Sequence, residues 1–308
     1  MNTTLDNLRT ETAEISDLSP YAFAAAVWST INEPGDQTAG ALIAALGSDA
    51  ALRLLLETDS ATYEELDVQT LRERALPRLS PGLITMAFRA AARFGAHLIT
   101  PEHPHWPTGF ADLGNTAPHA LWVRGNTELL TRSPSTAIIG ARAATGYGEH
   151  VAMEITAGLV ERDHTIVSGA AYGIDGMAHR AALASHGTTI AYLAGGVDRY
   201  YPSGHDALLS TIVDRGAVVS ELPCGQPPTK WRLLMRNRLI AAHTQRTVVV
   251  EAGWRSGSLN TAGHAIKIGR PVGAVPGPVT SAASAGCHRL IRDYGATLVT
   301  NAEEIDQM

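Results

Sequence analysis

From Ser135 onward, the chain alternates short apolar segments with glycine-containing loops and amphipathic stretches. Continuous Val, Ile and Ala runs of this kind suit strands that are covered on both faces. Strands joined by helices run parallel, with right-handed crossovers. The pattern therefore predicts an α/β fold with a doubly wound, mostly parallel sheet. The predicted strands are TAIIG, HTIVS, TTIAYLAG, AVVSE, RTVVVEA, PVGAV and ATLVT.

The front of the chain has a different periodicity. Apolar residues recur there at helical intervals between Pro and Gly breaks, which predicts helices at 21–31, 39–46, 50–56, 71–79 and 81–94. Pro-rich loops and short extended pieces follow. We predict a small helical domain at 1–95, a connector with short strands at 96–130 and a Rossmann-like domain at 131–308. In the turn INEPGDQTAG, Glu33 and Asp36 would repel phosphate, so packing or partner docking is favoured over DNA contact.

The composition, with 45% hydrophobic and 18% charged residues, is that of a soluble globular protein. No apolar run reaches the ~18 residues of a membrane span, and the polar, acidic N-terminus is unlike a signal peptide. We therefore expect a cytoplasmic protein without membrane contact. Cys224 and Cys287 have no metal-ligand spacing, and His103 and His105 lie in a Pro-rich loop without Cys or carboxylate partners, so no metal site is expected.

The formal net charge of -6 is unusual for a nucleic-acid binder, since phosphate contacts need Lys and Arg. The acids are concentrated at the front, however. Residues 1–80 contain 13 acids and 5 bases, whereas residues 81–308 contain 17 acids and 19 bases. The charge therefore does not exclude a nucleic-acid site in the second part.

Ligands of open α/β sheets bind beyond the carboxyl ends of the strands, where helix N-termini favour anions. In this chain those loops are rich in Gly, Ser and Arg. Glycine allows close backbone approach, serine donates hydrogen bonds, and arginine forms a bidentate contact. The loops at 140–142, 168–173, 195–198 and 253–258 thus predict a phosphate site. Neither a GxGxxG pattern with its ribose-reading acid nor a Walker motif is present, so no NAD or ATP cofactor is expected.

The segment 228–246 is the strongest local signal, because it contains five bases and no acid. If it is helical from Trp231, then Arg232, Arg236 and Asn237 share one face. We predict that the Arg-Asn-Arg group at 236–238 contacts phosphate, since two arginines around an amide have little other reason to be buried. Trp231 and Trp254 are either core residues, which the pattern favours, or stacking platforms for unpaired bases.

Four acids near strand ends, Asp175, Asp198, Glu221 and Glu251, are interpreted as helix caps and arginine partners rather than as a general acid/base pair. Asp175 is a candidate N-cap for a helix from Gly176, and Glu251 is a candidate partner of Arg238 or of the 256–258 loop. No nucleophile–base pair is evident. The protein is therefore expected not to be an enzyme.

The blocks IGARAATGYG, SGAAYGIDGMAHRAAL, LAGGVDRYYP, VSELPCGQPP, MRNRLIAA, VVVEAGWRSGSLNTAGHA, GRPVGAVPGP and SAGCHRLI resemble, in order, the core of the DprA/Smf family. The front half also looks like the family's small helical domain, which is SAM-like or helix-hairpin-helix-like, and its connector. The resemblance implies an extended Rossmann-like fold that binds and protects single-stranded DNA. It also implies homodimers formed through the late part of the α/β domain and transfer of the strand to the RecA recombinase in natural transformation, without catalysis or cofactor.

Carried over by position, the DNA pocket of the family falls on Arg142, Ser168, Gly169, Arg236, Asn237, Arg238, Ser256, Gly257, Ser258 and Thr261. Our predicted nucleic-acid-binding set adds Tyr172, Lys230, Trp231 and Arg232.

The sequence departs from the family pattern at several positions. Gly-Ala-Arg replaces Gly-Ser-Arg, Tyr172 replaces a frequent arginine, and His205 replaces an asparagine. Leu234-Met235 replaces an aromatic-Pro pair, which leaves Trp231 as the candidate for stacking. A C-terminal winged helix is common in the family, and we expect it to be absent here or removed.

Two other functions compete with DNA binding. A phosphoribohydrolase resembling the Lonely Guy enzymes would need a PGGxGTxxE block, but SGSLNTAGHA lacks the in-line glutamate. A nucleotide sensor would bind one small ligand in the same loops. Dependence of affinity on strand length discriminates the sensor from a strand binder.

Overall fold

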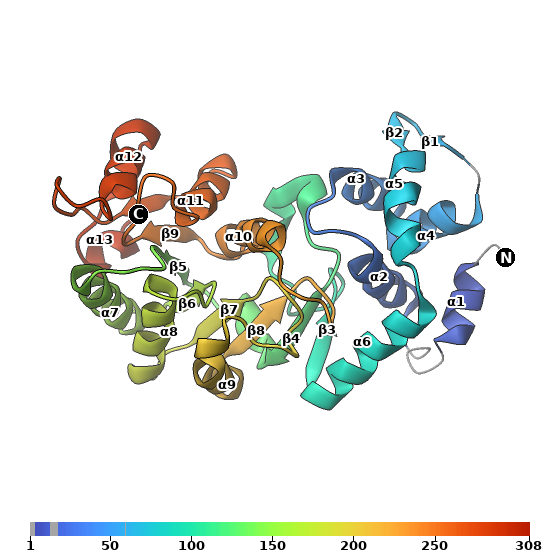
Figure 1. The fold of residues 1–308 in the computed structure, drawn as a ribbon, viewed down its shortest axis with the longest axis horizontal. Coiled ribbons are helices and arrows are strands. Elements are labelled where there is room, and N and C mark those ends of the chain that lie inside the picture. The colour runs from blue at the N-terminus through green and yellow to red at the C-terminus, as the bar shows by residue number, and fades with distance from the viewer. Residues whose placement is uncertain (1–3, 13–17, 59) are drawn as a thin grey trace.

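The computed structural model describes residues 4–12, 18–58 and 60–308. Its first part is a group of short helices with one small hairpin, and its second part is a sheet flanked by helices (Figure 1). The elements of the first part are α1 (Leu5–Glu11), α2 (Pro20–Ile31), α3 (Gln37–Leu46), α4 (Ser48–Glu57), the hairpin strands β1 (Thr62–Tyr63) and β2 (Leu66–Asp67), α5 (Val68–Ala75), the 3-10 helix η2 (Leu76–Arg78) and α6 (Pro81–Phe94). The five predicted helices are confirmed to within a few residues, and α1 and the hairpin were missed.

The second part holds a nine-stranded sheet within the described residues, in the order β11-β10-β9-β5-β6-β7-β8-β4-β3. Its strands are β3 (Ala96–Ile99), β4 (Leu121–Gly125), β5 (Ser135–Ile139), β6 (Thr165–Ser168), β7 (Thr189–Tyr192), β8 (Ala217–Ser220), β9 (Arg246–Val249), β10 (Val272–Ala274) and β11 (Thr297–Leu298). Strands from β11 to β8 are parallel, and the pairs β8–β4 and β4–β3 are antiparallel. The predicted α/β class and all seven predicted strands are confirmed.

Helices connect these strands on both faces of the sheet. They are α7 (Gly146–Val160), α8 (Ile174–Ala184), α9 (Asp206–Arg215), α10 (Lys230–His243), α11 (Ser258–Lys267), α12 (Ala285–Tyr294) and α13 (Ala302–Asp306), with the 3-10 helices η3 (Thr108–Thr116), η4 (Thr127–Thr131) and η5 (Ser203–His205). The 96–130 segment, predicted as a connector, supplies β3 and β4 and so extends the sheet by two strands. The predicted domain boundaries remain predictions.

Alternate residues of the central strands face two separate cores, because side chains alternate along a strand. One set packs against the side of the sheet that carries α10, α11 and α12, and includes Ile139, Val167, Tyr192 and Val249. The other set packs against α7, α8 and α13, and includes Ile138, Ile166, Val248 and Val250. Both faces of the sheet are therefore buried, as the continuous apolar runs predict.

The turn between α2 and α3 packs against α10 of the second part. Glu33 in this turn accepts two hydrogen bonds from Arg232, of 2.9 and 3.1 Å. Gly35 in the same turn packs against Met235 of α10, and its φ of +74° is a conformation that favours glycine. The packing interpretation of INEPGDQTAG is thus confirmed.

Within the described residues, no single helix is long and apolar enough to cross a membrane. One pair, α3 with α4, satisfies length and composition only when both helices are taken together across their 114° bend.

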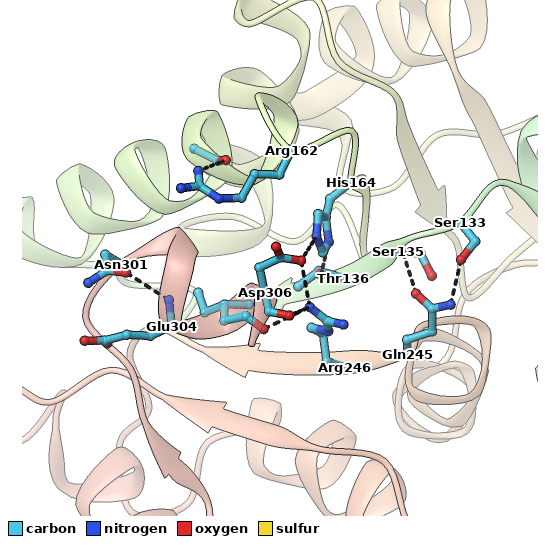
Figure 2. Close-up of polar contacts among 12 residues, drawn as sticks. Ser133, Ser135, Thr136, Arg162, His164, Gln245, Arg246, Asn301, Glu304 and Asp306 are labelled. Carbon is cyan, nitrogen blue, oxygen red and sulfur yellow. Dashed lines mark hydrogen bonds and ion pairs between the residues drawn. The ribbon is translucent and has the colours of Figure 1, made fainter. Parts of the chain in front are cut away.

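The last helix, α13, is fastened to the amino-terminal ends of the central strands (Figure 2). Oδ1 of Asp306 lies 2.8 Å from Nε2 of the buried His164. Nδ1 of His164 lies 2.8 Å from the hydroxyl of Thr136, near the start of β5. Arg246 donates to the carbonyls of Ile305 and Asp306 at 3.0 and 2.8 Å. This chain of contacts joins α13 to β5 and β9 at the end of the sheet opposite the predicted phosphate loops.

Lowering the pH from about 7.5 to about 5.5 is expected to destabilise the protein. Burial lowers the pKa of His164, and it lowers those of His119 and His243 to about 4 and that of His179 to about 3. These imidazoles take up protons less readily in the folded protein than in the unfolded chain, where protonation occurs below ~6.5, so stability falls as the pH drops through that value. The shift of urea midpoint between the two pH values measures the loss.

The His164→Gln variant is the control for this response. Its urea midpoint should shift less than that of the wild type, because one of the four imidazoles with a lowered pKa is gone. The pKa of Asp306 is lowered mainly by the hydrogen bond from His164. That contribution is lost as the pH falls below ~3.9, outside the tested window. Equal shifts in the two proteins would rule out a role for His164.

Candidate nucleic-acid interface

The chain reverses direction across the sheet between β5 and β9. From β5 it proceeds through β6 and β7 to β8, and then α10 crosses back so that β9 lies on the other side of β5. The loops after β5 and β9 therefore diverge at the carboxyl edge and leave a crevice between them. Ligands of doubly wound sheets bind at such a point.

A groove of about 590 Å³ occupies this crevice. Its wall combines the loops after β5, β6 and β9 with α10, the start of α11 and the loop before α12. Its polar lining includes Arg142, Asp175, Arg236, Asn237, Ser256, Gly257, Ser258 and Thr261. Seven of them belong to our predicted set, so the sequence located this wall.

Arg236 forms the floor of the groove. Its guanidinium is buried and donates to the carbonyl of Gly169 at 2.8 Å and to that of Tyr192. Burial lowers the pKa of Arg236 to about 10, and the nearby Asp175 acts against that shift. At neutral pH the side chain remains a cation fixed at the base of the cavity. A side chain at Gly169 would collide with this guanidinium at 2.5 Å, which is why the loop runs through glycine here.

Asp175 holds the loop after β6 rather than capping a helix from Gly176, as we had predicted. The helix begins earlier, at Ile174, and the Asp175 carboxylate accepts from the amides of Gly169 and Ala171 at 3.1 and 3.4 Å. Burial raises the pKa of Asp175, whereas Arg236 and these amides lower it. Between these residues Ala170 has φ +53°, a conformation that L-residues adopt only at a cost of about 1–3 kcal/mol. These contacts stabilise the loop conformation in which Ala171 and Asp175 line the groove.

Asn237 joins α10 to the first turn of α11. Its Oδ1 accepts from Nε of Arg236 at 3.2 Å, and its Nδ2 donates to Oδ1 of Asn260 at 3.1 Å. Across the groove, the hydroxyls of Ser256 and Ser258 are 2.7 Å apart at the start of α11. The amide of Ser258 also donates to the Ser256 hydroxyl at 3.4 Å, so this loop closes on itself and presents its two hydroxyl groups at the groove.

Arg142 supplies an exposed cation to the site. It is exposed, and in the part of the chain that the structure describes it forms no ion pair. It lines both the main groove and a neighbouring pocket of about 100 Å³. The smaller pocket also has aromatic walls, from Tyr172 and Tyr201. An unpaired base and its phosphate are matched by this combination of flat rings and a free guanidinium.

Two arginines of the predicted set are not available at the groove. Arg238 has a side chain only 1% exposed, and its guanidinium forms an ion pair of 2.6 Å with Glu221. Arg232 is held by Glu33 and by the carbonyl of Pro227 at 2.9 Å. Their expected phosphate contacts are therefore wrong in this structure. Both side chains instead join α10 to its neighbours within the chain.

Other predicted positions also differ from expectation. Ser168 is fully buried and donates to the carbonyl of Ile138 at 2.6 Å, so its hydroxyl does not face the groove. Trp231 and Trp254 are 57% and 54% exposed, so the favoured core interpretation is wrong for both. Lys230 and Trp231 are exposed in the first turn of α10, and they precede Leu233, the first residue of this helix that lines the groove. Glu251 binds the amide and hydroxyl of Thr145 at 2.9 and 2.6 Å, not Arg238 or the 256–258 loop.

Apolar and small residues that the sequence did not predict complete the two cavities. Leu233 and Leu234 of α10 contribute to the groove, together with Ala282 and Ala283 before α12. Tyr201 and Pro202 contribute to the small pocket. Tyr201 lies three residues after the predicted loop at 195–198, so its position in the sequence was a usable signal. Nothing in the local sequence of Ala282 distinguishes it from any other loop alanine.

No metal centre is evident at the groove. Among residues 4–12, 18–58 and 60–308, no group of three or more His, Cys, Asp or Glu side chains has the arrangement of a metal site. His103 and His105 pack ring against ring at 4.9 Å, and His105 lies 2.9 Å from the hydroxyl of Thr127.

Comparison with known proteins assigns the family. The family model of DNA recombination-mediator protein A matches residues 97–308, more than half of the chain. The chain belongs to this family. A DNA processing protein DprA of Mycobacterium tuberculosis is 46% identical over 300 residues, covering 94% of this chain and 75% of its own length.

Two solved DprA structures share the architecture. DprA from Streptococcus pneumoniae aligns with a TM-score of 0.76 at 28% identity, covering 94% of this chain and 98% of that one. DprA from Helicobacter pylori, described for its single-stranded DNA binding mode, aligns with a TM-score of 0.64 at 27% identity, covering 70% and 96%. The resemblance to the DprA/Smf family that the sequence motifs indicate is confirmed.

Proposed function

We propose that this DprA-family chain binds single-stranded DNA in the groove at the carboxyl edge of its sheet and leaves the strand chemically unchanged. The proposal is carried by one observation. The exposed guanidinium of Arg142 and the hydroxyl groups of Ser256 and Ser258 line one cavity, and a buried cation, Arg236, lies at its base. These groups donate hydrogen bonds to anions, and their arrangement matches a phosphate backbone.

The absence of catalysis is part of the proposal. Asp175 is the acid that lines the groove, and it is already held by two backbone amides and faces Arg236. A general acid or base must reach a proton of the substrate and have a partner that orients it for transfer. A carboxylate that accepts hydrogen bonds from its own loop is better suited to fix the loop.

The proposed role in the cell is based on the resemblance to the family. We infer that the chain works in the cytoplasm as a homodimer, protects incoming single strands and transfers them to RecA during transformation and recombination. The family resemblance supports these points, and the relatives are DNA processing proteins and recombination mediators. Formation of RecA filaments on strands preloaded with this protein tests the transfer.

Affinity for oligo-dT is expected to rise with length over several nucleotides and to fall steeply with added salt, because each phosphate contact releases counterions. Fluorescence anisotropy at two salt concentrations, with duplex DNA as the comparison, measures both effects. Similar affinity for dTMP and a long oligomer would instead identify a nucleotide sensor. Release of free base from nucleoside 5'-monophosphates would indicate a phosphoribohydrolase.

A further inference from the structure

The loop that forms one wall of the groove also carries an exposed aromatic surface. Gly253, Ser256 and Gly257 line the groove, while Trp254 between them is 54% exposed. The amide of Ser256 donates to the carbonyl of Gly253 at 3.0 Å, which closes a tight turn with Trp254 and Arg255 at its tip. The same short loop therefore has one side on the groove and a large ring at its outer end.

Side chains of α12 hold the Trp254 ring in place. The guanidinium of Arg289 lies 5.0 Å from the centre of the indole and 5.4 Å from the ring of Tyr294, and it donates to the Tyr294 hydroxyl at 2.9 Å. Backbone hydrogen bonds hold the base of the loop to the start of α12, from Gly286 to the carbonyl of Ala252 at 2.7 Å. The indole is thus held by a cation–π contact, and about half of it remains open to solvent.

The charges around this surface are positive. Arg255 is exposed, and within the described part of the chain it forms no ion pair. The nearest acid on α12 is Asp293, which is engaged by Arg292 through hydrogen bonds of 2.7 and 3.0 Å. A polyanion would therefore meet Arg255 and Arg289 without an opposing free carboxylate from this helix.

We propose that Trp254, Arg255, Arg289 and Tyr294 form a stacking platform onto which a single strand passes as it leaves the groove. This inference rests on the proposed function and adds the path of the strand over the loop. A half-exposed indole held by a guanidinium offers one flat face to a base, and Arg255 beside it fits a phosphate. Continuity with the groove through a single loop favours a nucleic-acid strand over the alternative occupant, a second copy of the chain.

The test compares a short and a long oligo-dT, of about 4 and about 16 nucleotides, because only the long one spans groove and platform. Trp254→Ala is expected to weaken binding of the long oligomer on the order of tenfold and to change the short one less than twofold, roughly the loss of one stacked base. Trp254→Phe should keep most of the affinity. Phe94→Ala is the matched control, since Phe94 is also partly exposed and stacked by Arg124 at 5.5 Å, but lies on α6.

A second readout does not depend on affinity. Stacking of a base on the indole should quench tryptophan fluorescence in the wild type, and the quench should be smaller in Trp254→Phe when both are saturated with the long oligomer. Light scattering of the free proteins gives their oligomeric state in the same buffer.

Wild-type affinity of Trp254→Ala for the long oligomer would overturn the platform, and so would equal weakening for both oligomers. A changed oligomeric state in Trp254→Ala would assign the surface to a second copy instead. Wild-type protein that binds neither oligomer would refute the proposed function itself, an outcome distinct from loss of the platform alone.

Discussion

We expect the Arg238→Ala variant to lose about 3–5 kcal/mol of unfolding free energy, which is the usual cost of removing one partner from a buried ion pair. Arg238 donates to Glu221 through both terminal nitrogens, at 2.7 and 2.6 Å, and through Nε to the carbonyl of Thr116 at 2.8 Å. The Glu221 side chain is only 9% exposed, so alanine would leave a carboxylate without its partner away from water. Urea unfolding monitored by circular dichroism measures the loss.

Two further variants separate the cause of this destabilisation. Arg232→Ala breaks a more exposed pair, since the Glu33 side chain is 31% exposed, and should cost only about 1 kcal/mol. A double replacement of Arg238 and Glu221 by Met and Leu should recover most of the stability, because it removes both charges together. A fully stable Arg238→Ala protein with weakened DNA binding would contradict the structural role of Arg238 and would indicate that its side chain contacts DNA.

The ion pairs of Arg232 and Arg238 could not be predicted from the sequence. The sequence predicts DNA contacts for both because the 228–246 segment contains bases and no acid. Their acidic partners are remote in sequence, with Glu33 199 positions from Arg232 and Glu221 17 positions from Arg238. A local count of charge therefore cannot distinguish a surface cation from one that joins two parts of the fold.

The fold and the groove were predictable because their signals are local. Apolar runs separated by helical stretches specify parallel strands, and the carboxyl ends of parallel strands, with the loops that follow them, lie at one edge of the sheet. Arg142 and the Ser256–Ser258 turn could thus be placed together without coordinates. The exposure of Trp254 could not, because it depends on Arg289 and Tyr294 of α12 packing beneath a ring that hydrophobicity assigns to the core.

Reversing the charge of Arg142 is expected to give the largest loss of DNA binding. Arg142→Glu should weaken affinity for a long oligo-dT by about 100-fold or more at low salt, because it removes a charge-assisted phosphate contact and adds repulsion. Thermal unfolding should not change, since the Arg142 side chain is exposed and has no ion pair among the described residues. Fluorescence anisotropy and a melting curve on the same sample measure the two properties.

The comparison that isolates a contact from overall charge is Arg162→Glu. Arg162 is also exposed, but it lies just before β6, at the opposite edge of the sheet, where its guanidinium donates to the carbonyl of Gly158 at 2.8 Å (Figure 2). Its reversal should alter affinity only slightly, by long-range repulsion that salt screens. The neutral variant Arg142→Ala should also reduce the slope of log affinity against log salt by about 0.7, the share of one single-strand phosphate. Equal losses in the two reversed proteins, with no change of slope in Arg142→Ala, would show that net charge rather than this guanidinium governs binding.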